Sequence, residues 1–316
     1  MFHHFHGRSH NDDYAGSFSS SDFERIILKI GLKNIYGPLE WTELFMRGEL
    51  EESKYCLTFD DGLRSQVDVA LPILRNYGLK AFWFVCSSPY SQEFPRLDLY
   101  RRFMYQYFDR VEDFYEMFFH KVPCSHESFD ASYKNWSSKM LETFPFYSEW
   151  DVKFRYVRDR LLSKHSYEVI VDSIIDEFGL TLQELAEGLW INERDLKSLQ
   201  EEGHVLGMHS HDHPTNFAEL DVAEQAEQYR RNLAFLSTIS QGVFSMSHPC
   251  GAYTAATIDL LESFGITIGF RSNSGDLGYL DSKRFDLQLP RLDAASFLRS
   301  LGNGGSEEAP SSGFRP

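Results

Sequence analysis

The sequence predicts an α/β fold, and two patterns along the chain lead to this prediction. Short runs of apolar, β-branched or aromatic residues alternate with longer segments in which apolar residues recur at helical spacing. A single predicted strand is followed by a single predicted helix, which is typical of a parallel barrel or a doubly wound sheet. The chain has 316 residues, of which 42% are hydrophobic, so it can bury a large core as one large domain or two ordinary ones.

Seven segments have the composition of strands. They are short and contain mostly apolar, β-branched or aromatic residues. In chain order they are Phe2–His6, Tyr55–Phe59, Ala81–Cys86, Val205–His209, Val243–His248, Ile266–Phe270 and Leu287–Leu292.

Four segments between these strands have the pattern of helices. A run of serines and Asp22 can cap the first of them, whose apolar residues share one face. Gly78 and Gly265 follow two others and fit the position after a helix, where a left-handed residue is common. The predicted helices are Phe23–Ile30, Val67–Tyr77, Asp221–Thr238 and Ala255–Phe264.

The region 88–195 interrupts the alternation of strands and helices. It is far longer than an ordinary connection, it is rich in aromatic residues, and its apolar residues recur at helical spacing. We therefore predict a helical insertion with its own core, in a barrel domain formed by residues 1–87 and 196–301. The alternative is a functional region in which exposed Tyr and Trp side chains stack on sugars or cover the site. Residues 302–316 are rich in Gly, Ser and Pro and are predicted to form a flexible tail.

The net charge and the positions of the cysteines restrict the partners and the compartment expected for the protein. The formal charge is −16, with 31 Lys and Arg against 47 Asp and Glu, which argues against a nucleic-acid partner. No apolar run reaches the roughly 18 residues of a transmembrane helix, and the first residues do not have the pattern of a signal peptide. We expect a cytoplasmic protein with reduced thiols at the scattered positions Cys56, Cys86, Cys124 and Cys250.

Two adjacent carboxylates end the second predicted strand. Asp60, Asp61 and Gly62 follow the apolar run 57–59. Neighbouring side chains of a strand point to opposite faces, so both acids can face one cavity only where the backbone bends. One carboxylate can then bind a cation while the other transfers protons. The alternative is a strand-end turn in which Asp61 caps the next helix.

A histidine cluster ends another predicted strand. His209 and His213 have three residues between them, a spacing that presents two imidazoles from one turn and is common in divalent-metal sites. Together with Asp61 they supply two nitrogens and one oxygen, and they leave positions for water and substrate as a catalytic zinc requires. His211 can replace either neighbour as a ligand, and a histidine-rich surface loop without metal is the alternative.

These two clusters resemble motifs of the polysaccharide deacetylase family, also called the NodB-homology or carbohydrate esterase 4 family. The motifs are TFDDG at 58–62 and HSHDHP at 209–214, and the segments 246–253 and 289–293 resemble two later ones. The resemblance covers Met1–Arg75 and Gly203–Leu301 and leaves the insertion outside. It implies a distorted (β/α) barrel of six to eight strands around a divalent metal, usually zinc.

The resemblance also implies roles for individual residues. Asp60 is the catalytic base, and Asp61, His209 and His213 are the metal ligands. Arg291, in a late strand, orients Asp60 through a charge-assisted hydrogen bond.

This sequence departs from the family pattern in its arginine and its general acid. Ser247 and His248 stand where many members have an arginine, so Arg291 is expected to take over that role. No histidine follows His248, although many members have one there that protonates the leaving amine. The candidates for this acid are His248 and the N-terminal residues His3, His4 and His6, and strand alternation places His3 on the face opposite His4 and His6.

We therefore predict a metal-dependent hydrolase that removes an N-acyl group, in the first instance acetyl, from an amino sugar. With Zn²⁺ as cofactor and a cytoplasmic setting, its substrate is expected to be an N-acetylated glycan precursor. A non-sugar amide is the alternative within the same chemistry. A non-catalytic carbohydrate-binding protein on the same barrel is the alternative from another class. The oligomeric state is left open.

Overall fold

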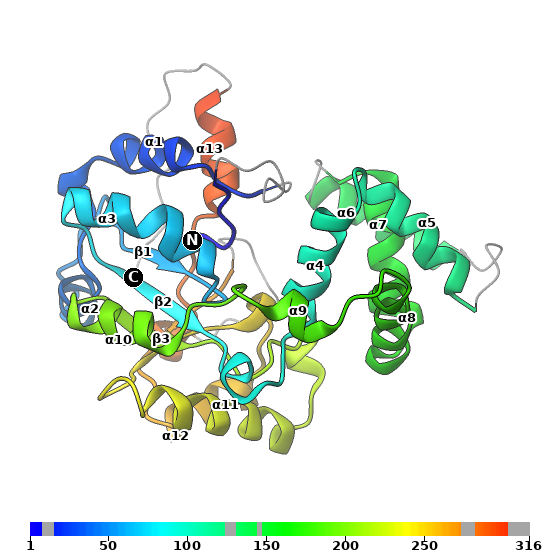
Figure 1. The fold of residues 1–316 in the computed structure, drawn as a ribbon. Coiled ribbons are helices and arrows are strands. Elements are labelled where there is room, and N and C mark those ends of the chain that lie inside the picture. The colour runs from blue at the N-terminus through cyan, green and yellow to red at the C-terminus, as the bar shows by residue number, and fades with distance from the viewer. Residues whose placement is uncertain (8–15, 124–130, 144–146, 273–281, 303–316) are drawn as a thin grey trace. The chain divides into compact units, whose positions relative to one another are not determined.

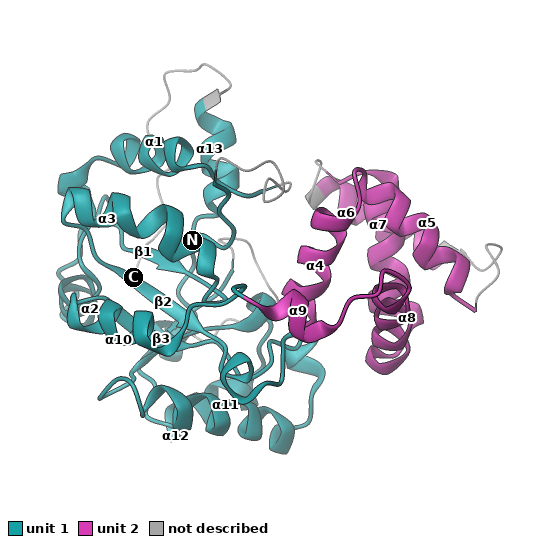
Figure 2. Cartoon of the chain, viewed as in Figure 1, with its two compact units in different colours: residues 1–95, 188–316 teal, residues 96–187 magenta. Residues whose placement is uncertain are grey.

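The structure, a computed structural model, describes residues 1–7, 16–123, 131–143, 147–272 and 282–302. The chain separates into two compact units (Figure 2). Unit 1 comprises Met1–Pro95 and Gly188–Pro316, and unit 2 comprises Arg96–Glu187. Unit 2 falls within the region 88–195 that the sequence sets apart as an insertion. Apart from its first residue, the predicted tail 302–316 lies outside the described residues.

Unit 1 is built around a parallel sheet of five strands in the spatial order β1-β2-β3-β4-β5 (Figure 1). Each strand lies inside one of the predicted strands. Their residues are buried throughout, as expected of a parallel sheet that is covered on both faces. The strands are β1 Leu57–Phe59, β2 Ala81–Val85, β3 Val205–Met208, β4 Ser245–Ser247 and β5 Ile268–Phe270.

The first and last predicted strands are wrong in length, because the first is present only as two isolated bridges, at Phe2 and Phe5, and the last only as one, at Leu289. Phe2 bridges β1 at one edge of the sheet, and Leu289 bridges β5 at the other. Pro290, which has no N–H to donate, interrupts the last predicted strand. The two edge segments also meet, since the Met1 amino group donates to the carbonyl oxygen of Leu292 at 2.7 Å. The sheet is thus curled into a distorted (β/α) barrel, which confirms the barrel that the resemblance implies, although the described residues form five strands rather than six to eight.

Helices cover the outer face of this barrel (Figure 1). Apolar residues of α1, α3, α10, α11 and α12 pack against outward side chains of the strands such as Trp83, Leu206 and Met246. The four predicted helices are present, although the segment 66–77 begins with a wider π turn before α3. The helices of unit 1 are α1 Ser20–Ile30, α2 Pro38–Met46, α3 Leu71–Tyr77, α10 Glu193–Glu201, α11 Val222–Leu236, α12 Ala255–Ser263 and α13 Ala294–Gly302.

Inward side chains of the strands form a second, smaller apolar cluster. Phe82 and Phe84 of β2 pack against Phe270 of β5, with ring centroids 5.3 and 5.5 Å apart. Gly207 of β3 makes room for them, because a Cβ at this position would lie 2.5 Å from ring atoms of Phe84. These rings fill the barrel interior below the carboxyl ends of the strands, where the inward positions become polar.

Unit 2 is helical and has an aromatic core. Phe103, Phe114, Phe118 and Phe154 are buried in it, and their rings meet edge to face, with centroids 5.0 Å apart for Phe118 and Phe154. Its helices are α4 Arg96–Tyr107, α5 Val111–Lys121, α6 Ala131–Thr143, α7 Glu149–Tyr156, α8 Lys164–Glu177 and α9 Leu182–Ala186. In the part of the chain that the structure describes, no helix is long and apolar enough to cross a bilayer.

Candidate metal and catalytic site

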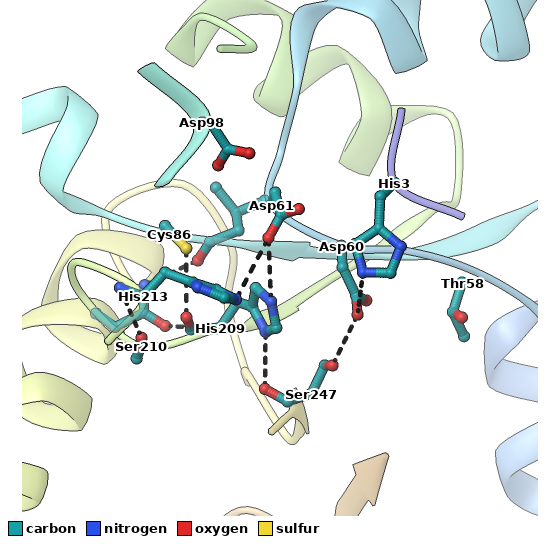
Figure 3. Close-up of polar contacts among 12 residues, drawn as sticks. His3, Thr58, Asp60, Asp61, Cys86, Asp98, His209, Ser210, His213 and Ser247 are labelled. Atoms are coloured by element: carbon teal, nitrogen blue, oxygen red, sulfur yellow. Dashed lines mark hydrogen bonds and ion pairs between the residues drawn. The ribbon is translucent and has the colours of Figure 1, made fainter. Parts of the chain in front are cut away.

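The candidate site lies at the carboxyl ends of three strands (Figure 3). Asp60 and Asp61 follow β1, His209 follows β3, and Ser247 is the last residue of β4. Because the carboxyl ends of parallel strands lie at the same rim of a barrel, residues far apart in the sequence converge there. The structure therefore brings the aspartate pair and the histidine cluster to one place.

The backbone bends sharply where these side chains converge. Asp61, Ser210 and His213 adopt positive φ angles of 72°, 64° and 53°, a left-handed conformation that costs an L-residue about 1–2 kcal/mol. The bend at Asp61 lets it face the same cavity as Asp60 despite strand alternation. Gly62, at φ 67°, continues the turn. A Cβ on it would lie 3.1 Å from Val85 Cγ1.

Asp61, His209 and His213 form a buried three-residue cluster. The Nε2 atoms of His209 and His213 lie 3.3 and 3.6 Å from Asp61 Oδ1, and one potential ligand atom from each of the three residues falls within 4.8 Å of the others. Asp61 Oδ1 and His209 Nε2 are buried and have no hydrogen-bond partner among the described residues. His209 Nδ1 donates to the carbonyl oxygen of Ser247 at 2.8 Å, which leaves Nε2 with a free lone pair.

This cluster fits a divalent metal. Two imidazole nitrogens and one carboxylate oxygen are a donor set that zinc and similar ions accept, and the unpartnered atoms Asp61 Oδ1 and His209 Nε2 lie 3.3 Å apart. Burial and the neighbouring His209 lower the pKa of His213 to about 4, which keeps that imidazole neutral. Burial also opposes protonation of His209, but Asp61 and Asp60 outweigh it and raise the pKa of His209. A divalent cation would compete with this proton, as at other histidine sites.

Asp60 is held in a buried ion pair with Arg291. The guanidinium donates from Nη1 to Oδ1 at 2.7 Å and from Nη2 to Oδ2 at 2.6 Å, so the predicted charge-assisted hydrogen bond is present. Ser247 Oγ donates to Asp60 Oδ2 at 3.1 Å and accepts from Arg291 Nη2 at 2.8 Å. Arg291 is itself fixed by its Nε, which donates to the carbonyl oxygen of Arg271.

The ion pair decides the charge of Asp60. Burial raises the pKa of this carboxyl, but the guanidinium of Arg291 outweighs burial and holds the pKa well below its usual range. Asp60 is therefore ionised and oriented at neutral pH.

His211 is not part of the cluster of Asp61, His209 and His213. Its Nδ1 is 2.8 Å from Ser87 Oγ, and its Nε2 is 3.4 Å from Glu93 Oε2. Its carbonyl oxygen accepts hydrogen bonds from the backbone N–H groups of Ser87 and Ser88. The middle histidine of the motif thus fastens the histidine loop to the segment after β2, while His209 and His213 face Asp61.

The candidate acids lie in different surroundings. His3 Nε2 is 3.6 Å from Asp60 Oδ2, and the His3 side chain is 36% exposed. His248 is 1% exposed, its Nε2 donates to the carbonyl oxygen of Leu287 at 2.8 Å, and its ring stacks on Tyr253. Burial lowers the pKa of His248 to about 4. His6 Nδ1 pairs with a serine hydroxyl, Ser17 Oγ, at 2.7 Å.

The predicted alternation of the N-terminal histidines is wrong. The rings of His3 and His4 are stacked with centroids 6.4 Å apart, and a ring nitrogen of His4 lies within 4.8 Å of an Asp61 oxygen. Phe2 and Phe5 are the residues buried in the core, so the apolar spacing is three rather than two. The segment bends between its two bridges and presents both histidines together.

Sequence reasoning missed the residues that support the site. Ser247 is a polar residue at an inward strand position, inside the segment 246–253 that resembles a family motif, and this position is the signal that could have found it. Asn232 and Gln228, on α11, bind backbone groups of the histidine loop. In the sequence each of them is an amide on the buried side of an amphipathic helix, and this pattern does not predict which group the amide contacts.

Comparison with known proteins identifies the family. The sequence model described as "Polysaccharide deacetylase" matches residues 47–106 and 170–269, which is just over half of the chain. The matched segments contain both motif clusters at the site. A comparison with curated protein sequences gives no match.

Two solved structures have the same fold. The chain is similar to the Streptococcus pyogenes deacetylase PplD in complex with acetate, with 15% identity, a TM-score of 0.54, and coverage of 92% of this chain and 89% of that one. It is also similar to IcaB from Ammonifex degensii, with 14% identity, a TM-score of 0.52, and coverage of 94% of each chain. At these identities the likeness concerns the fold.

Proposed function

The chain belongs to the polysaccharide deacetylase family, a class of hydrolases, and from this premise we propose that it is a metal-dependent N-deacetylase of amino sugars. The observation that carries the proposal is the buried cluster Asp61–His209–His213 beside an ionised, oriented Asp60. A metal-ligating triad next to a fixed carboxylate is what hydrolysis of an unactivated amide needs.

Asp61, His209 and His213 would hold the metal. A divalent ion in this position supplies Lewis acidity toward the amide carbonyl and lowers the pKa of a bound water toward about 7. The protein's own contribution is to fix the three donors. His209 is oriented by its hydrogen bond to the Ser247 carbonyl oxygen, and Asp61 by its left-handed backbone.

Asp60 would act as the general base. Its carboxylate is ionised, and Arg291 and Ser247 fix both of its oxygens. It is 2% exposed, so the attacking water would give up its proton in an environment that excludes bulk solvent. Arg291 would then stabilise the orientation of the base throughout the reaction.

His3 is the best-placed general acid. It contacts Asp60, and part of its ring is exposed, so it can reach both the base and a substrate. The observed contacts of His248 are with a backbone carbonyl and the Tyr253 ring. His3 would donate a proton to the departing amine, and the reaction would release a free amine and acetate.

The substrate class follows from the family and from the predicted setting. We propose an N-acetylated sugar in a glycan or a glycan precursor, with Zn²⁺ as the ion. A cytoplasmic location would favour the precursor over a finished polymer. The second candidate, a non-catalytic carbohydrate-binding barrel, would keep the metal cluster and sugar affinity without turnover.

Acetate release tests the proposal. The purified full chain, loaded with Zn²⁺, is incubated with N-acetylglucosamine, its oligomers and nucleotide-linked N-acetyl sugars, and acetate is measured. Asp60→Asn is expected to retain bound zinc and lose at least about 100-fold in kcat, and His213→Ala is expected to lose zinc and activity. Asp259→Asn, an exposed carboxylate paired with Arg284, is the matched control. Full activity of Asp60→Asn would remove the base assignment.

The same assay separates the candidate acids. His3→Gln is expected to lower kcat with zinc content unchanged, and His248→Gln is expected to keep kcat. If instead His248→Gln lowers kcat and His3→Gln does not, the general acid is His248. Bound zinc and bound sugar without acetate release from any substrate would favour the binding protein.

A further inference from the structure

Helix α11 contacts the histidine loop 209–213 through two side-chain amides one turn apart. Asn232 is fully buried. Its Oδ1 accepts from the backbone N–H of His209 at 3.0 Å, and its Nδ2 donates to the carbonyl oxygen of Val85 at 2.9 Å. The last paired residues of β2 and β3 are Val85 and Met208, so this amide joins the two strands just where their ladder ends.

Gln228 lies one helical turn before Asn232 and binds the middle of the loop. Its Oε1 accepts from the backbone N–H groups of His211 and Asp212, each at 3.0 Å. Two amides at i and i+4 share one side of a helix. Asn232 and Gln228 together satisfy three backbone donors of the histidine loop.

The loop needs such external support because its own backbone is strained. Ser210 and His213 both have positive φ angles, which L-residues rarely adopt and which persist only where the surroundings hold them. Inside the loop, the His213 N–H donates to Ser210 Oγ at a long 3.2 Å. The separation of His209 and His213 therefore depends on groups outside the loop.

We propose that Asn232 and Gln228 are positioning residues that hold His209 and His213 at the separation required for binding a divalent metal. This inference rests on the proposed metal site. Partners that orient ligands without touching the metal commonly change its affinity 10–100-fold when they are replaced. Here the partners act on the backbone of the loop rather than on the imidazole rings.

The two amides have different chemical requirements, which makes the proposal specific. Asn232 uses both its acceptor and its donor, so Asn232→Asp loses the bond to Val85 and sets a carboxylate against a carbonyl oxygen. Gln228 uses only its acceptor toward the loop, so Gln228→Glu preserves both bonds and Gln228→Met removes them. The same amide-to-acid exchange is thus harmful at one position and conservative at the other.

The matched control is a third amide on the same helix. Gln225 is buried, its Nε2 donates to the carbonyl oxygen of Leu220, and its Oε1 accepts from Thr257 Oγ1. It makes no hydrogen bond to the histidine loop. Gln225→Met therefore reports what the loss of a buried amide on α11 does to the protein in general.

Metal affinity is the readout. The dissociation constant of each full-length variant for Zn²⁺ is measured by competition with a chromophoric chelator, and the stability of each metal-free variant is measured by urea unfolding. We expect a 10–100-fold weaker affinity for Gln228→Met and Asn232→Asp, and a change within about threefold for Gln228→Glu. Gln225→Met is expected to lose stability and keep its affinity.

The two Gln228 variants test the inference even if Asn232→Asp does not fold, because Gln228 is only partly buried. Wild-type affinity in Gln228→Met, or an equal loss of affinity in Gln225→Met, would overturn the inference while leaving the metal site intact. If the wild-type chain binds zinc no more tightly than Asp61→Asn, the proposed metal site itself fails, and the inference with it.

Discussion

Replacing Arg291 with methionine tests whether the guanidinium of Arg291 stabilises the buried negative charge of Asp60. Methionine keeps an unbranched apolar stem and removes the guanidinium. Asp60 is 2% exposed and Arg291 6%, so water does not replace the lost partner. Of the observed hydrogen bonds to the Asp60 side chain, those at 2.7 and 2.6 Å come from Arg291, and the Ser247 hydroxyl at 3.1 Å remains.

The expected cost follows from this geometry. Breaking a buried ion pair from one side leaves an uncompensated charge and lowers the free energy of unfolding by about 3–5 kcal/mol. At about 2–4 °C per kcal/mol for a domain of this size, the melting temperature falls by roughly 6–20 °C. The double variant Asp60→Asn/Arg291→Met removes both charges of this pair and should recover most of this loss, because paired replacement of buried ions is often neutral.

Urea and thermal unfolding of the wild type, both single variants and the double variant measure the effect, with a chelator present so that metal binding does not contribute. The cycle should give a coupling energy of about 2 kcal/mol or more between the two positions. An Arg291→Met variant within about 1 kcal/mol of the wild type would refute the reasoning. So would a double variant as unstable as the single one.

Three further predictions concern stability. Gly207→Ala places a Cβ 2.5 Å from the ring of Phe84 and should cost about 1–3 kcal/mol in urea unfolding. Gly7→Ala, whose Cβ would meet nothing within 4 Å, is the control and should stay within about 0.5 kcal/mol. Burial lowers the pKa of His204 to about 4. As the pH falls, this histidine is therefore protonated in the unfolded chain before it is protonated in the folded protein. The stability from His204 is complete above pH 6.5 and falls by about 3 kcal/mol as the pH drops to 4. This loss of stability should be absent in His204→Asn. If the stability of His204→Asn falls between pH 6.5 and 4 as much as that of the wild type, the prediction is wrong. Zinc at 100 times its dissociation constant should stabilise the wild type by about 2.7 kcal/mol against a chelator-treated sample. The same thermal shift in His213→Ala would count against the ligand set.

The strands and the motif residues could be predicted because their signals are local. Buried parallel strands are continuous apolar runs, and each observed strand lies inside a predicted one. The need for a bend between Asp60 and Asp61 also follows from strand alternation, and the left-handed φ of Asp61 supplies it.

What could not be predicted depends on contacts between distant segments. The N-terminal segment has strand composition. However, Phe2 and Phe5 are both buried although they are three residues apart, and His3 and His4 therefore lie on the same side of the segment. Asn232 is one of many polar residues on an amphipathic helix. Its importance appears only when the helix packs over the end of β3.

The ion pair at the centre of the site also bears on how the protein folds. Asp60 and Arg291 are separated by 231 residues, and the whole of unit 2 lies between them in the sequence. Such a contact carries a high entropic cost of chain closure and is slow to form. Asp60 therefore acquires its partner only after the last barrel segment has docked. Enzymatic activity in a refolding experiment should appear late, after the recovery of helical signal.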